Sequence, residues 1–441
     1  MSIKMKKFFK LFLLCTIVFG TIFSFRVEAL AKEVKPKPPS YQTVTEIEDW
    51  GAMITKVIVN LGRSIPVKSV TTHTFKVHVT RVDNRLANPL LEKGYRTVTN
   101  AYVADKKGNP SRKSGNYVVF EMEIGPSISL GSPMNFDIDS FTNSWIHSKY
   151  VITQQKDIVT PRGKISGLII DTYSGGSINL VDEFSTGKST YGDITLTYAD
   201  FKPTKDHQKN PLIIWLHGGG EGGTDPTIPI AANKAANFSS SSIQSYFGGA
   251  YVLAPQTPTY WMDGSREENG SSKYEGALMN LITNYVAQNK DIDLKRIYIG
   301  GNSNGGYMTM RMIQRFPRFF AAAFPTCEAL RDTLISNRDI QRMKDVPIWF
   351  VAAKTDTIVP VNDFVVPTYN RLIDAGAKNV HLSLFDNVID TSGLYKKEDG
   401  TPYEYDGHWS WIYVYNNEVS KFINNKKITL MKWLSNQSLS H

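Results

Sequence analysis

One serine of this chain lies where it could act as a nucleophile. The residues Gly301-Asn-Ser-Asn-Gly305 follow the short apolar stretch 296–299 and precede a segment with helical character. A sharp turn from strand to helix holds its central residue in strained backbone, and flanking glycines prevent side-chain clashes. The turn would raise the Ser303 hydroxyl above the strands. The first N–H groups of the following helix would then face a developing oxyanion.

A serine hydroxyl becomes a good nucleophile only when a base removes its proton, and histidine is the usual base. Most of the chain's histidines can be set aside by position: three in the β-rich first part, two before the serine, one at a strand start and one at the last residue (His73, His78, His147, His207, His217, His381, His441). A strand start is the wrong end, because sites of parallel sheets form at strand C-termini. His408, in a loop after the last predicted strand, is therefore the predicted base.

The acid that orients the histidine should follow a strand between Ser303 and His408. The apolar run 346–353 is followed shortly by Asp356, which is the preferred acid. Asp386 also follows a predicted strand and remains a rival. Asp406 stands two residues before His408 and could serve only if its loop folds back.

A tetrahedral oxyanion needs two hydrogen-bond donors. The backbone N–H of Asn304, directly after the serine, is one predicted donor. The sequence His217-Gly-Gly-Gly-Glu221 follows the apolar strand 212–216 and offers the amides of Gly218 and Gly219. A phosphate-binding loop is the alternative, but the segment lacks both the G-K-[ST] ending and the G-x-G-x-x-G spacing.

Metal and cofactor chemistry finds no support in the motifs. The chain has no H-E-x-x-H sequence and only two cysteines, so no metal site and no cofactor are predicted. Asp137 and Asp139 could contact a cation, but two carboxylates without further ligands are better read as solvated. The chemistry predicted for Ser303, Asp356 and His408 is acyl transfer through an acyl-enzyme.

The elements expected to hold these residues belong to two domains. Residues 43–157 alternate in short β-type segments separated by turns, which predicts an all-β sandwich of immunoglobulin-like size. Residues 158–441 alternate strands with helical patterns, which predicts an α/β domain with a mostly parallel eight-stranded sheet. Its expected strands are 165–172, 192–198, 212–216, 250–254, 296–299, 321–324, 348–352 and 380–384.

The N-terminus has the pattern of an export signal. Four lysines precede the apolar run 11–23, and Ala29-Leu-Ala31 offers a cleavage site, so residues 1–31 are predicted to be a signal peptide of a secreted bacterial protein. A Pro-rich linker, 32–42, follows. The prefix holds five basic residues and one acidic residue, so the net charge falls from +9 to +5 without it. No basic run is interleaved with aromatics, and nucleic acid is not an expected partner. A membrane span after signal cleavage is not expected either.

Cysteine usage is consistent with a core stabilised by burial alone. Once residues 1–31 are removed, Cys327 is the single remaining cysteine, and an intrachain disulfide cannot form. The chain is long enough for two domains with cores of their own.

The stretch 211–408 resembles secreted bacterial serine esterases of the polyhydroxybutyrate-depolymerase and feruloyl-esterase-like branch of α/β-hydrolases. The resemblance rests on Trp215–Gly223, on Ala254-Pro-Gln256 with Trp261 soon after, on Arg296–Gly306 and on the Asp356 segment. The two-domain arrangement is similar to that of thermostable esterases with an N-terminal immunoglobulin-like domain. The resemblance implies hydrolysis of small or polymeric carboxylic esters by Ser303, Asp356 and His408. It also leaves room for a homo-oligomer formed through the β-domain.

Two other functions compete with a serine carboxylesterase. Chains of this type are often labelled prolyl-oligopeptidase-like, so a serine peptidase for short peptides is one alternative, although the large propeller domain of true prolyl oligopeptidases is missing. A cell-surface carbohydrate- or polymer-binding protein is the other. Its support is the β-domain together with Trp261, Trp409 and Trp411.

Overall fold

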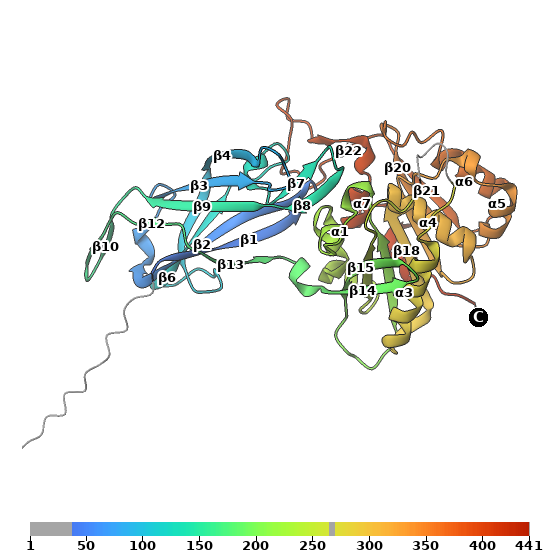
Figure 1. Cartoon of the computed structure of the whole chain (residues 1–441), viewed down its shortest axis with the longest axis horizontal. Coiled ribbons are helices and arrows are strands. Elements are labelled where there is room, and N and C mark those ends of the chain that lie inside the picture. The colour runs from blue at the N-terminus through green and yellow to red at the C-terminus, as the bar shows by residue number, and fades with distance from the viewer. Residues whose placement is uncertain (1–37, 264–269, 441) are drawn as a thin grey trace, which may run out of the picture. The chain divides into compact units, whose positions relative to one another are not determined.

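The computed structural model describes residues 38–263 and 270–440, and Pro38–His441 cluster as one compact unit. The predicted signal peptide and most of the predicted linker lie outside the described residues. The described chain begins with a β-sandwich and continues into an α/β domain (Figure 1).

The sandwich consists of a five-stranded sheet in the order β13-β1-β2-β6-β5 and a four-stranded sheet in the order β12-β9-β3-β4. Residues alternate between buried and half-exposed along β1, because successive side chains of a strand point to opposite faces. The inward residues of both sheets, including Val57, Val77, Phe120 and Tyr150, form one apolar core. The strands are β1 (Ser40–Glu48), β2 (Gly51–Pro66), β3 (Phe75–Val82), β4 (Leu90–Arg96), β5 (Val98–Ala104), β6 (Ser114–Met122), β9 (His147–Gln154), β12 (Ile169–Ile170) and β13 (Tyr173–Ile178).

Two hairpins project from the sandwich sheets. One is formed by β7 (Met134–Asp137) and β8 (Thr142–Trp145), the other by β10 (Ile158–Thr160) and β11 (Gly163–Ile165). The β7–β8 hairpin contacts the α/β domain: the Trp145 indole N–H donates to the Thr227 hydroxyl at 2.8 Å.

The sandwich extends about twenty residues beyond the predicted boundary at 157/158. β12 pairs with β9, and β13 runs parallel to β1, so the segment expected to supply a strand 165–172 of the α/β sheet belongs to the sandwich instead. Ile165 and Ile170 are buried in the sandwich core, which explains this assignment. The sandwich also begins earlier than predicted, because β1 starts at Ser40, inside the predicted linker.

The α/β domain is built on an eight-stranded sheet in the order β14-β15-β17-β16-β18-β19-β20-β21. β14, β15 and β17 pair antiparallel, and the pairs from β17 to β21 are parallel. The predicted fold class is therefore confirmed. The strands are β14 (Ser185–Tyr191), β15 (Ile194–Phe201), β16 (Asn210–Leu216), β17 (Tyr251–Gln256), β18 (Ile292–Asn302), β19 (Ala322–Thr326), β20 (Ile348–Ala353) and β21 (Val380–Phe385).

Strand β14 was not anticipated from the sequence. Its residues, Ser-Thr-Gly-Lys-Ser-Thr-Tyr, are half-buried or exposed and include no aliphatic side chain. As the edge of the sheet it pairs on one side only, so it needs no continuous apolar run.

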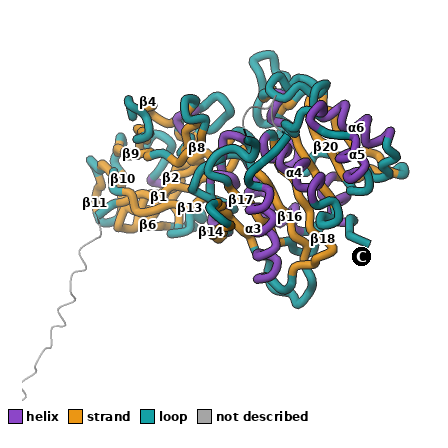
Figure 2. Tube along the Cα trace, turned by 45° about the vertical axis from the view of Figure 1, so that its right-hand side comes forward, coloured by secondary structure: helices purple, strands orange, loops and turns teal. Residues whose placement is uncertain are grey.

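Helices cover both faces of this sheet (Figure 2). On β16, Leu212, Ile214 and Leu216 pack in one core with residues of α3–α6, whereas Ile213 and Trp215 pack in another with α7 and α8. The period-two alternation of a strand buried on both faces produces this division. The helices are α1 (Ile228–Ala231), α2 (Ser241–Gln244), α3 (Glu275–Gln288), α4 (Asn304–Arg315), α5 (Asn337–Met343), α6 (Val365–Asp374), α7 (Trp411–Tyr415) and α8 (Leu430–Ser435).

Two short hairpins complete the domain, β22 (Val388–Ile389) with β23 (Glu404–Tyr405), and β24 (Ser420–Ile423) with β25 (Lys426–Thr429). Within the described ranges, no helix combines the length and apolar character needed to cross a membrane.

Candidate active site

Ser303 occupies the sharp turn between β18 and α4. Its φ of 53° and ψ of −114° lie outside the regions that residues other than glycine usually occupy, which marks a strained backbone. The strain is maintained by hydrogen bonds: the Ser303 N–H donates to Thr326 O at 2.9 Å, and Ser303 O accepts from the Tyr307 N–H at 2.9 Å. The side chain is half-buried, at the C-terminal end of the parallel strands.

The glycines beside Ser303 are required by a close approach of backbones. A Cβ atom on Gly305 would lie 1.9 Å from the carbonyl oxygen of Leu216, and one on Gly301 would lie 2.6 Å from the same oxygen. The first turn of α4 therefore lies directly against the end of β16. The serine turn and the loop that follows β16 are held together by this contact.

His408 and Asp356 meet through a hydrogen bond of 2.8 Å between Nδ1 and Oδ2. The other carboxylate oxygen, Oδ1, accepts the N–H groups of Ile358 and Val359 at 2.9 and 2.8 Å. The Asp356 side chain is fully buried and that of His408 is 10% exposed. An ionised Asp356 requires the proton on Nδ1, so Nε2 is the nitrogen that can accept a proton.

The two rival carboxylates are placed elsewhere. The Asp386 side chain is 85% exposed and pairs with Lys354 at 2.6 Å; this neighbouring ammonium lowers the pKa of Asp386. Asp406 turns its Oδ1 to the backbone N–H of His408 at 2.8 Å and thereby caps the short helix Gly407–Trp409. The structure therefore brings Asp356, and neither of the others, to the imidazole ring.

Cys327 follows β19, the strand that lies between β18 and β20. It is buried, and its backbone N–H donates to Val351 O of β20 at 2.7 Å. Burial raises the pKa of Cys327, so the group is a neutral packing element. Ser303, Cys327 and Asp356 thus follow three neighbouring strands at one edge of the sheet.

The His217–Glu221 loop is fixed by its own histidine. His217 Nε2 accepts the Thr257 N–H at 3.1 Å, so Nδ1 carries the proton and donates to Gly218 O at 2.7 Å. Burial lowers the pKa of His217 to about 4, which keeps the ring neutral at pH 7. Next to it, the Trp261 N–H donates to Asn304 Oδ1 at 2.6 Å and the Trp261 indole donates to His217 O at 3.1 Å.

The predicted oxyanion donor Gly218 lies beside a buried carboxyl group. Glu221 Oε1 accepts from Asn233 Nδ2 at 3.0 Å, and a Cβ atom on Gly218 would lie 2.9 Å from Glu221 Oε2. The amides of Gly218, Gly219 and Asn304 stay the predicted oxyanion donors. Burial raises the pKa of Glu221 to about 7. Sequence reasoning missed this carboxyl group, although an acidic residue within a glycine-rich apolar segment was a visible signal.

The tryptophans proposed for polymer binding are mostly internal. Trp261 is fully buried and Trp411 is 6% exposed, with Trp411 packed edge-on against the His408 ring at 5.3 Å between centroids. Both tryptophans are thus internal to the domain and do not form an exposed surface. The observation that favoured a carbohydrate-binding surface is thereby largely removed.

No group of three or more His, Cys, Asp or Glu side chains that could hold a metal ion occurs in residues 38–263 and 270–440. Asp137 is engaged by Ser140, whose N–H and hydroxyl donate to Oδ2 at 3.1 and 2.5 Å.

Comparison with known proteins agrees with this architecture. Residues 40–167 match the family model of the esterase Ig-like N-terminal domain, and residues 259–330, which include Ser303, match that of the prolyl oligopeptidase family. The chain therefore has an α/β-hydrolase fold preceded by an immunoglobulin-like domain that matches the N-terminal domain model of esterases. The match to the esterase Ig-like domain ends at residue 167, near the start of β12. It therefore also places the end of this domain beyond residue 157.

Individual relatives extend the comparison. A stretch of 127 residues is 28% identical to a poly(3-hydroxybutyrate) depolymerase of Ralstonia pickettii; it covers 27% of this chain and 25% of the depolymerase. The chain thus spans a quarter of that relative's length. The crystal structure of a thermostable esterase matches with a TM-score of 0.73 at 24% identity, covering 90% of this chain and 99% of that one. A ferulic acid esterase matches with a TM-score of 0.35 at 16% identity, covering 46% of this chain and 89% of that one.

The buried Glu221 makes stability depend on pH. Its pKa of about 7 in the folded state exceeds its ordinary value of 4.5, so the native state retains a proton that the unfolded state releases between these values. Stability contributed by this group is present below pH 4.5 and is lost as the pH rises through 7. This loss of folding stability amounts to about 3 kcal/mol for a pKa shift of this size. We expect Glu221→Gln to reduce the loss, because the amide does not ionise.

Urea unfolding of both proteins at pH 4.5 and pH 8 measures the effect. As the pH rises, the unfolding free energy of the wild type should fall more than that of Glu221→Gln. An equal pH dependence in the two proteins would show that Glu221 titrates normally.

Proposed function

We propose that this esterase-like α/β-hydrolase cleaves carboxylic esters by a Ser-His-Asp acyl-enzyme mechanism and is exported from a bacterial cell by its N-terminal signal. The observation that carries the proposal is the hydrogen bond between Asp356 and His408, at the same strand ends as the strained Ser303. It leaves His408 Nε2 as the proton acceptor. The similarity to esterases and to a depolymerase of an ester polymer supports the choice of substrate class.

The first half of the reaction forms the acyl-enzyme. His408 Nε2 takes the proton of Ser303 while Oγ attacks the ester carbonyl carbon. The negative charge that develops on the carbonyl oxygen is stabilised by the N–H groups of Gly218, Gly219 and Asn304, and Asn304 is also the first residue of α4. Asp356 stabilises the imidazolium that forms. The proton then passes from His408 to the alcohol oxygen as the ester bond breaks.

The second half reverses these roles with water. His408 Nε2 removes a proton from water, whose oxygen attacks the acyl carbon, and the same amides stabilise the second oxyanion. The proton returns to Ser303 Oγ as the acid leaves, which regenerates the enzyme. All proton transfers in this scheme run through one nitrogen, because Nδ1 stays bonded to Asp356.

Ser303→Ala should lower kcat for nitrophenyl esters by about four to six powers of ten, because only binding and oxyanion stabilisation remain. It should also abolish covalent labelling by a fluorophosphonate. Ser242→Ala, at an exposed position of α2, is the matched control and should retain both. Near-native turnover or labelling of the Ser303 variant would refute the assignment of the nucleophile.

Asp356→Asn should reduce kcat by about three to four powers of ten, because the amide no longer selects the productive tautomer of His408. Asp386→Asn removes only an exposed partner of Lys354 and should change kcat by less than about twofold. Steady-state kinetics of both variants decide between the acids. A larger loss at Asp386 would reverse the assignment.

A peptidase activity is the second candidate, because residues 259–330 match the prolyl oligopeptidase family. Against it, the described N-terminal domain is a β-sandwich of two sheets rather than a large propeller. We expect kcat/KM for short nitrophenyl esters to exceed that for peptide anilides by at least about a hundredfold. Equal or higher values for the anilides would favour the peptidase.

A further inference from the structure

The β7–β8 hairpin of the immunoglobulin-like domain touches the loop that supplies a predicted oxyanion donor. Asn143 Nδ2 donates to Gly220 O at 3.1 Å. A Cβ atom on Gly220 would lie 3.1 Å from the Phe136 ring, and one on Gly219 would lie 3.3 Å from the Phe141 ring and 3.0 Å from that of Tyr260. Three aromatic rings thus lie within contact distance of Gly219 and Gly220.

These three rings form a continuous apolar surface, which we call the aromatic wall (Phe136, Phe141, Tyr260). The centroids of Phe136 and Phe141 are 5.0 Å apart, and those of Phe141 and Tyr260 are 6.1 Å apart. Each ring residue remains 40–43% exposed. Large apolar side chains that cluster in an exposed position mark a surface that binds something apolar.

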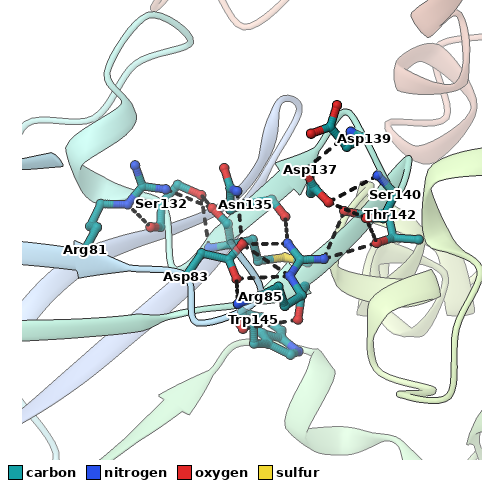
Figure 3. Close-up of polar contacts among 12 residues, drawn as sticks. Arg81, Asp83, Arg85, Ser132, Asn135, Asp137, Asp139, Ser140, Thr142 and Trp145 are labelled. Carbon is teal, nitrogen blue, oxygen red and sulfur yellow. Dashed lines mark hydrogen bonds and ion pairs between the residues drawn. The ribbon is translucent and has the colours of Figure 1, made fainter. Parts of the chain in front are cut away.

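The hairpin is held in place by a polar network that reaches from Asn135 of β7 to Thr142 of β8 (Figure 3). Arg85 pairs with the buried Asp83 at 2.7 Å and donates to Asn135 O at 3.0 Å and to Thr142 Oγ1 at 3.1 Å. Asn135 Nδ2 also donates to Asp83 Oδ2 at 3.0 Å. The hydrogen bond from Arg85 lowers the pKa of Asp83 to about 2, so this pair stays charged at neutral pH.

Further contacts anchor both ends of the hairpin. Arg81 donates to Met134 O at 2.8 Å at the start of β7, and Trp145 at the end of β8 donates to Thr227 across to the α/β domain. At the tip, Asp137 bonds Ser140, and Phe141 adopts a φ of 53°, which costs energy for a residue with a side chain. Hydrogen bonds of the neighbouring Ser140 and Thr142 hold the chain on both sides of Phe141.

We propose that Phe136 and Phe141 of the immunoglobulin-like domain bind the apolar part of the ester substrate and determine its specificity. The inference rests on the proposed function. When the Gly219 N–H holds the carbonyl oxygen of an ester, one of the two substituents on the carbonyl carbon comes to lie beside the Phe141 ring. An alkyl chain or aromatic ring at that place removes apolar surface from water, whereas an acetyl or methyl group is too small to cover the wall.

The test uses the full chain and two series of esters. In the acyl series, nitrophenyl acetate, butyrate and octanoate share one alcohol; in the alcohol series, methyl, butyl and octyl acetates share one acid. Wild type, Phe141→Ala, Phe141→Leu and Tyr95→Ala are compared. Tyr95 is the matched control, since it is a 64% exposed aromatic residue of the same domain that packs edge-on against His78.

We expect Phe141→Ala to lower kcat/KM for the octyl or octanoate ester about tenfold, mainly through KM, and to change the shortest ester less than about twofold. Phe141→Leu should restore most of the loss, and Tyr95→Ala should behave as wild type. The series that responds identifies which side of the ester faces the wall. Unchanged chain-length selectivity in both series would overturn the inference while leaving the esterase intact; absence of ester turnover in wild type would overturn the proposed function itself.

Discussion

The contact between Gly305 and the carbonyl oxygen of Leu216 is the constraint on which the site depends. It presses the first turn of α4 against the end of β16, at a distance that leaves no room for a Cβ atom. One result is that Ser303 projects from a strained turn. The other is that the loop after β16 and the N-terminus of α4, the two sources of the proposed oxyanion donors, are neighbours. Neither element could provide that geometry alone.

The ionisable groups around this contact differ in their burial and in their hydrogen-bond partners. His217 is buried without an ionic partner, so its pKa is lowered and it acts as a neutral clamp on the glycine loop. Glu221 is also buried, and its pKa is raised although it accepts a hydrogen bond from Asn233. Asp356, in contrast, receives two backbone N–H groups and the imidazole, a set of donors suited to a charged carboxylate.

The immunoglobulin-like domain is more than an appended module in this chain. Its β7–β8 hairpin bonds to Gly220 and to Thr227, and Asp49, which follows β1, accepts from Lys234 and from Asn416. These contacts reach the glycine loop, the segment after α1 and the end of α7. The sandwich therefore contacts the glycine loop, which lies against the Ser303 turn, and further segments of the α/β domain.

Much of the site could be predicted because its signals are local. Glycines at positions that exclude side chains, an apolar strand before Ser303 and a strand-end aspartate are visible in short windows of sequence. Elimination among eight histidines then isolated His408. Strand β14 escaped notice because an edge strand needs no apolar run, and the strands from Ile158 to Ile178 were misassigned because an apolar residue does not reveal which of two cores it enters.

By itself, the sequence determined the two-domain order, the α/β class and the small set of residues that could perform acyl transfer, since these follow from periodicity, glycine placement and residue type. Only the tertiary structure decided that Asp356 rather than Asp386 meets His408, that the buried Glu221 pairs with Asn233, and that Phe136 and Phe141 lie beside the glycine loop. The physical reason is that each of these outcomes is a contact between segments far apart in the chain or a backbone orientation imposed by such contacts. Local sequence does not encode them.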